Sequence, residues 1–158
     1  MIHLNNYGWN DKLSQLKQES TYNALTHGRI SIVHRTCYEV VSENGLFQCE
    51  LTGNMMYGKS DFELPCTGDW VLFQPFDEHK GIIVDMLPRE RTLYRKKNGT
   101  VADKQTIASY VDKAFIVQSL DDNFNVRRAE RFMVQMQEEH INPCLLYTSP
   151  SPRDGLLS

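Results

Sequence analysis

Short stretches in which polar and apolar residues alternate dominate the chain between residues 29 and 86. Alternation with a period of two is typical of a strand that has one buried face. The pattern predicts strands near residues 29–32, 38–40, 47–51, 69–73 and 82–86. Asn44-Gly45, between the second and third stretches, is a strong hairpin signal. Five short strands joined by turns predict a small β-barrel or sandwich, and closure into a barrel would leave no sheet edge exposed.

The segments on either side of this all-β domain, which we place at residues 26–90, have a different texture. Residues 1–25 are a polar N-terminal extension, in which Asn10 is suited to cap a short helix with Leu13 and Leu16 on one face. Pro88 ends the last predicted strand, and residues 91–109 are predicted to be a basic linker.

Five basic residues near the start of this linker are the candidate RNA-binding residues: Arg89, Arg91, Arg95, Lys96 and Lys97. Small barrels bind nucleic acids through a basic groove with aromatic stacking platforms. The net charge of -3 and the pI near 5.9 are far from the profile of a strong RNA binder. A solvated linker with ordinary surface charge therefore stays open as the alternative. Trp70 and Phe73 are expected in the barrel core.

A second domain is predicted to begin at residue 110. Residues 111–120 form a mainly apolar run without clean alternation, which is typical of a strand covered on both faces. From Asn125, apolar residues recur at helical spacing, and residues 141–143 resemble the entry to a second parallel strand. Residues 110–143 are thus expected to be the truncated start, one strand and one helix, of an α/β domain. One strand and one helix lack the sheet that would cover them.

The C-terminal residues 144–158 are predicted to be a non-native tail. Residues 144–154 match one reading frame of a transposase adapter used in sequencing libraries at every position. Segments of this origin are left out of fold reasoning. A native Pro/Ser-rich tail is the alternative.

Residues 53–60 fit the phosphate-loop pattern G-x-x-x-x-G-K-[ST] through Gly53, Gly58, Lys59 and Ser60. A working phosphate loop must open a helix, whose N-terminus faces the phosphates. Only residues 61–64 separate Ser60 from Pro65, which is about one helical turn, and a single turn is not a stable helix. We interpret the match as coincidence and predict no nucleotide-binding residue. A small nucleotide hydrolase built on this loop is the alternative, and it would need a helix after Ser60.

Neither a metal site nor membrane attachment is predicted. The four cysteines, at positions 37, 49, 66 and 144, form no C-x-x-C pair, and the histidines are scattered. No apolar run approaches the roughly 20 residues of a membrane helix, and the first residues do not resemble a signal peptide. The chain is therefore expected in the cytoplasm, without metal ligands or catalytic residues.

Several motifs, taken in order, resemble the ribosome small-subunit-dependent GTPase family (RsgA/YjeQ). They are Asn6-Tyr7-Gly8-Trp9, Gly68-Asp69-Trp70-Val71, Leu87-Pro88-Arg89, Leu93-Tyr94-Arg95-Lys96, and the segments 105–112, 115–120 and 124–132. The resemblance implies an OB-fold barrel followed by a circularly permuted GTPase domain and a zinc domain. It also implies a cytoplasmic GTPase that acts in 30S subunit maturation and contacts 16S rRNA, with neither DNA nor membrane as a partner.

GTP, Mg²⁺ and Zn²⁺ are cofactors that the resemblance implies for the intact protein. The family's guanine-reading motif, phosphate loop and zinc-binding cysteines would all follow residue 143, so no cofactor is expected in this chain. We therefore expect an N-terminal fragment that acts as an RNA-binding OB module without GTPase activity. The alternative is a self-contained OB-type RNA-binding module that is not an enzyme.

Overall fold

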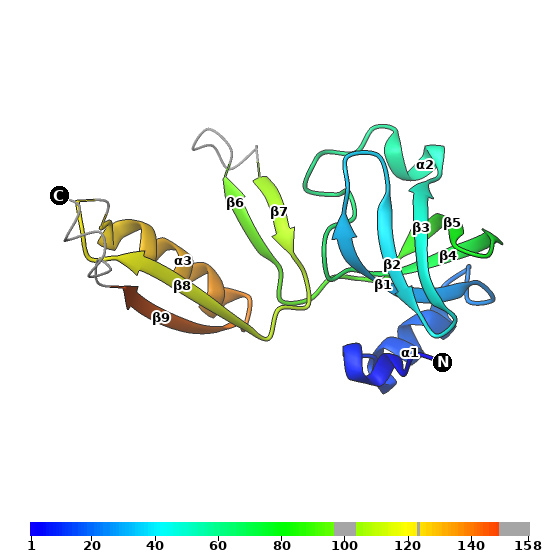
Figure 1. The fold of residues 1–158 in the computed structure, drawn as a ribbon, viewed down its shortest axis with the longest axis horizontal. Helices are drawn as coiled ribbons and strands as arrows, with labels where there is room; N and C mark the ends of the chain where they lie inside the picture. Colours follow the sequence, from blue (N-terminus) through cyan, green and yellow to red (C-terminus); the bar gives the residue numbers. More distant parts are fainter. Residues whose placement is uncertain (97–103, 123, 149–158) are drawn as a thin grey trace, which may run out of the picture. The chain divides into compact units, whose positions relative to one another are not determined.

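The structure is a computed structural model that describes residues 1–96, 104–122 and 124–148. The chain divides into two compact units, the first comprising Met1–Tyr110 and the second beginning at Val111 (Figure 1).

The first unit is built on a closed barrel of five strands in the order β1-β2-β3-β5-β4. The strands are β1 (Thr26–Val33), β2 (Tyr38–Ser42), β3 (Gly45–Leu51), β4 (Trp70–Asp77) and β5 (Lys80–Met86). Strands β3 and β5 pair in parallel, and the other neighbours are antiparallel. The five predicted strands are confirmed, and they form a barrel rather than a sandwich, as the OB-fold expectation requires.

Alternate residues of these strands fill the barrel. The core consists of Ile30, Val40, Phe47, Cys49, Val71, Phe73 and Ile83, together with Met55 from helix α2 (Gly53–Met56). Gly28 allows strands to approach closely, since a Cβ there would lie 2.5 Å from Cγ1 of Val40. Phe73 lies in this barrel core, as predicted, whereas Trp70 is buried in a separate apolar cluster on the outer side of the strands.

The N-terminal extension packs onto the barrel. It contains the short 3-10 helix η1 (Leu4–Tyr7) and helix α1 (Asp11–Glu19), and the Asn10 side chain accepts a hydrogen bond from the Leu13 backbone N–H, as predicted. A second apolar cluster joins this extension to the outer side of the strands through Leu4, Leu13, Val41, Trp70, Leu72, Leu87 and Tyr110. Residues 1–25 are therefore part of the first unit's fold.

The segment expected to be a linker differs from the expectation, because it holds a β-hairpin. Strands β6 (Leu93–Lys96) and β7 (Lys104–Ala108) pair in antiparallel fashion. The tip between them lies outside the described residues. Basic side chains in β6 conceal its alternation in the sequence, whereas β-branched Thr106 and Ile107 favour an extended backbone in β7.

The second unit contains strand β8 (Lys113–Ser119), helix α3 (Val126–Glu138) and strand β9 (Asn142–Thr148). Strands β8 and β9 pair in parallel, and Asn125 caps the helix by accepting from the Arg128 backbone N–H. The predicted start of an α/β domain is confirmed, and β9 adds a second strand to the one strand and one helix expected. Strand β9 runs through residues 144–148 of the predicted non-native tail. The origin of that tail stays a prediction.

Candidate nucleic-acid interface

The β6–β7 hairpin carries the candidate RNA-binding residues. Its ladder pairs Tyr94 with Thr106, Arg95 with Gln105 and Lys96 with Lys104. Residues opposite each other in a ladder point to the same face, and neighbours along a strand point to opposite faces. Arg95 and Lys96 are both exposed, but they therefore lie on opposite faces of the hairpin. Lys97, the last predicted RNA-binding residue, lies outside the described residues.

A buried ion pair between Arg89 and Asp69 lies where the hairpin joins the barrel. The Nε of Arg89 is 3.0 and 3.1 Å from the two carboxylate oxygens of Asp69, and its Nη2 is 2.8 Å from Oδ2. The Asp69 side chain is 0% exposed and that of Arg89 is 13% exposed. Asp69 also accepts from the Ser109 hydroxyl and from the Cys66 backbone N–H. Burial disfavours the charged guanidinium, but hydrogen bonds to Asp69 and its negative charge outweigh this and raise the pKa of Arg89.

The remaining Arg89 donors are directed into the protein. Nη1 donates to the carbonyl oxygen of Phe62, and Nη2 donates to that of Leu64. The Arg89 side chain thus ties the β3–β4 loop to the start of the hairpin. Its guanidinium is therefore committed to partners within the first unit.

Arg91 also has internal partners. Its Nη1 lies 3.2 Å from the Glu90 carboxylate, and its guanidinium carbon lies 5.7 Å from the centre of the Tyr110 ring. The residue has a φ of 46°, which turns the backbone between β5 and β6. Burial and the nearby Glu90 and Asp69 carboxylates raise the pKa of Tyr110 to about 12, so its hydroxyl stays a neutral donor to the Pro88 carbonyl. Of the basic residues predicted as RNA-binding, Arg95 and Lys96 are the exposed ones among those the structure describes.

Two further residues, Phe62 of the β3–β4 loop and Lys104 of β7, contact the Tyr94 ring and were not predicted from the sequence. The Phe62 and Tyr94 rings meet edge to face, with centroids 6.2 Å apart. The Lys104 ammonium lies 4.4 Å from the centre of the Tyr94 ring and 5.9 Å from that of Phe62. Thr106 Oγ1 donates to the Phe62 carbonyl at 3.2 Å. No local sequence signal links Phe62 to a hairpin that begins at residue 93.

The segment that fits the phosphate-loop pattern has a different geometry from a working loop. Its short helix α2 lies inside the pattern, and residues 61–63 after Ser60 form a turn. The Ser60 backbone N–H and hydroxyl both donate to the Glu63 carboxylate, and these bonds lower the pKa of Glu63. Ser60 thus binds a carboxylate of its own loop. Assigning the match to coincidence stays a prediction.

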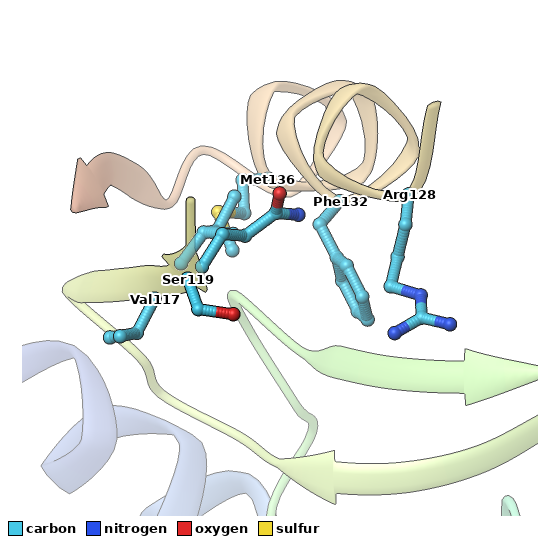
Figure 2. Close-up of a pocket in the computed structure, with 7 residues that line it drawn as sticks. Val117, Ser119, Arg128, Phe132 and Met136 are labelled. Carbon is cyan, nitrogen blue, oxygen red and sulfur yellow. The ribbon is translucent and has the colours of Figure 1, made fainter. Parts of the chain in front are cut away.

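The second unit has a hollow of about 380 Å³ between β8 and α3 (Figure 2). Arg128, Phe132 and Met136 extend into it from the helix, and residues 116–119 line it from the strand. Gln118 Nε2 donates to the Asn125 carbonyl at 3.1 Å, which joins the strand to the start of the helix. The hollow lies at the carboxyl end of β8, where open α/β sheets usually bind ligands.

Within residues 1–96, 104–122 and 124–148, no group of three or more His, Cys, Asp or Glu side chains is arranged to hold a metal ion. Among these same residues, no helix has the length and apolar character needed to cross a membrane.

The fold defines a class of protein in which an OB-type barrel is followed by the start of an α/β domain. A family model described as RsgA GTPase matches residues 86–149, across the hairpin and the second unit. The resemblance predicted from the ordered motifs, to the family called RsgA, is thereby confirmed.

Curated relatives extend the match to the barrel. The chain is 69% identical over 144 residues to "Small ribosomal subunit biogenesis GTPase RsgA 1" of Bacteroides thetaiotaomicron, covering 91% of this chain and 41% of that protein. It is 32% identical over 145 residues to "Small ribosomal subunit biogenesis GTPase RsgA 2" of Vibrio vulnificus, covering 92% of this chain and 38% of the relative. The chain thus spans about two-fifths of the length of these relatives.

Two crystal structures share the fold. YloQ, described as a circularly permuted GTPase, matches with a TM-score of 0.52 and 21% identity, over 82% of this chain and 42% of its own. YjeQ from Thermotoga maritima matches with a TM-score of 0.53 and 18% identity, over 77% of this chain and 40% of its own. At these identities the likeness shows the fold alone.

Proposed function

We propose that this chain is the N-terminal part of a small ribosomal subunit biogenesis GTPase and that its first unit contacts 16S rRNA in the cytoplasm. The observation that carries the proposal is the 69% identity over 91% of the chain to a relative with that name. The exposed Arg95 and Lys96 on the hairpin supply positive charge for phosphate contacts. Neither DNA nor a membrane is proposed as a partner.

RNA binding is tested by titrating the full chain with 16S rRNA or a labelled piece of it at several salt concentrations. We expect affinity to fall steeply with salt, and the salt slope to drop by about 2 in the double variant Arg95→Ala/Lys96→Ala. The matched control is Arg127→Ala/Arg131→Ala, which removes the same charge from exposed positions of α3. Equal losses in both variants would show attraction to charge in general and contradict a site on the hairpin.

We also propose that this chain does not hydrolyse GTP by itself. The support is local, because Ser60 is bound to Glu63 and followed by a turn rather than by a helix that could face phosphates. In this proposal GTP, Mg²⁺ and Zn²⁺ are bound by parts of the longer relatives that this chain does not cover. Turnover by the purified chain that disappears in Lys59→Ala would contradict the proposal and revive the loop.

A second candidate is a self-contained OB-type RNA-binding module without enzymatic activity. It is favoured by the first unit, which has its own closed barrel and two apolar clusters. The two candidate functions make different predictions about the parent DNA. Re-reading the parent DNA beyond codon 143 should reveal an Asn-Lys-x-Asp motif and a later glycine-rich loop if the GTPase proposal holds.

A further inference from the structure

One face of the β6–β7 hairpin combines positive charge with aromatic rings. Lys96 and Lys104 are opposite each other in the ladder, and the next pair on the same face is Tyr94 and Thr106. Phe62 reaches this face from the β3–β4 loop. We call these five residues the lysine–aromatic face.

The electrostatics of this face favour an anion. Like charges directly opposite each other in an antiparallel pair destabilise it, and neither β6 nor β7 carries an acidic residue. A phosphate near both ammonium groups would replace their repulsion by two favourable charge-assisted interactions. The like-charge pair of Lys96 and Lys104 therefore has a physical use if the ligand is anionic.

Phe62 is exposed although its backbone is fixed, and Tyr94 beside it is half-buried. Phe62 as a whole residue is 37% exposed, while its carbonyl accepts hydrogen bonds from both Arg89 and Thr106. The Tyr94 ring holds the Phe62 ring from the side, with an interplanar angle of 83°. A ring held in this way loses little conformational freedom when a flat apolar ligand stacks on it.

We propose that the lysine–aromatic face binds an unpaired nucleotide of RNA, with its phosphate near Lys96 and Lys104 and its base stacked on Phe62. This inference rests on the proposed contact with RNA. A duplex presents phosphates, but its bases are already stacked inside the helix and cannot reach a protein ring. The face should therefore favour single-stranded RNA over a duplex of equal length.

The test compares a labelled oligouridine with an RNA duplex of the same length, each titrated with the full chain. Phe62→Leu removes the stacking surface and keeps an apolar side chain. Base–aromatic stacking predicts that this variant binds the oligouridine about 5- to 150-fold more weakly. Its affinity for the duplex should stay within about twofold. The matched control is Phe115→Leu, which alters an exposed phenylalanine of the second unit and should change neither affinity.

A second measurement does not depend on a variant. Oligouridine containing 5-iodouridine should photocrosslink to Phe62 or Tyr94, as identified by mass spectrometry. Equal weakening for both RNAs, no weakening, or crosslinks confined to other residues would overturn the stacking inference and leave the proposed RNA contact in place. A wild-type chain that binds neither RNA at low salt would overturn the RNA contact itself.

Discussion

Separating Asp69 from Arg89 should destabilise the first unit more than any change at the hairpin surface. Asp69→Asn removes the negative charge but leaves the Arg89 guanidinium in a site where its side chain is 13% exposed. Breaking a buried ion pair by removing one partner costs about 3–5 kcal/mol. Domains of ordinary stability unfold with about 5–15 kcal/mol, so the variant should lose a large share of its stability.

Tryptophan fluorescence during urea unfolding is a suitable assay for this prediction. The two tryptophans, Trp9 and Trp70, both lie in the first unit, with ring centroids 5.0 Å apart. Their emission therefore reports on the unit that contains the ion pair. The exposed control Arg95→Met should change the free energy of unfolding by no more than about 0.5 kcal/mol.

A double-mutant cycle separates the ion pair from its surroundings. Asp69→Asn and Arg89→Met should each destabilise the unit strongly, and the double variant should cost at least about 1 kcal/mol less than their sum. Arg89→Lys keeps the charge but loses the forked geometry that reaches Asp69 and two carbonyls, so we expect an intermediate loss. Single losses below about 1 kcal/mol, or strict additivity, would refute the view that this pair holds the hairpin to the barrel.

Three further predictions concern backbone strain, pH and local opening. Gly68→Ala, at φ +96° with its new Cβ 2.2 Å from a backbone oxygen, should lower the urea midpoint well beyond Gly45→Ala, which faces open space at φ +123°; equal effects would contradict the clash. Burial, and then the Lys17 charge, lower the pKa of His27 in the folded chain. In the unfolded chain His27 therefore binds a proton at a higher pH than in the folded chain, and stability should fall as pH drops below about 6.5. In His27→Gln this fall should be smaller, and an unchanged profile would disprove the assignment. Hydrogen exchange should be faster in β8 than in β4, because a two-stranded sheet is marginally stable; equal protection would contradict this.

The elements predicted from the sequence are those that local patterns determine. Alternation identified the barrel strands, and Asn10 was recognisable as a helix cap because a cap bonds to a backbone N–H three residues away. The hairpin was not predicted because basic side chains occupy both of its faces and interrupt the apolar alternation that reveals a strand. The contacts that attach it to the barrel, such as those of Arg89 with Asp69 and of Thr106 with Phe62, join residues that are far apart in sequence.

The candidate site shows the same limit in a different way. In the sequence, five basic residues form one run, which suggests a single charged surface. The structure directs Arg89 and Arg91 to internal partners before β6 begins. Within β6 the period of two then places Arg95 and Lys96 on opposite faces. Charge density along a sequence therefore overestimates the charge that any one surface can present.

The second unit shows what a strand sequence implies about its surroundings. Strand β8 is apolar on both faces, a pattern typical of strands covered on both sides. Helix α3 covers one face, where Ile116 is buried, whereas Phe115 and Val117 on the other face are 59% and 60% exposed. The exposed side chains are thus the ones that a second layer would cover in a larger sheet. The same two-sided apolar pattern predicted an α/β domain. It is typical of a strand inside a larger sheet with both faces covered, whereas the pair β8 and β9 has one face covered by α3.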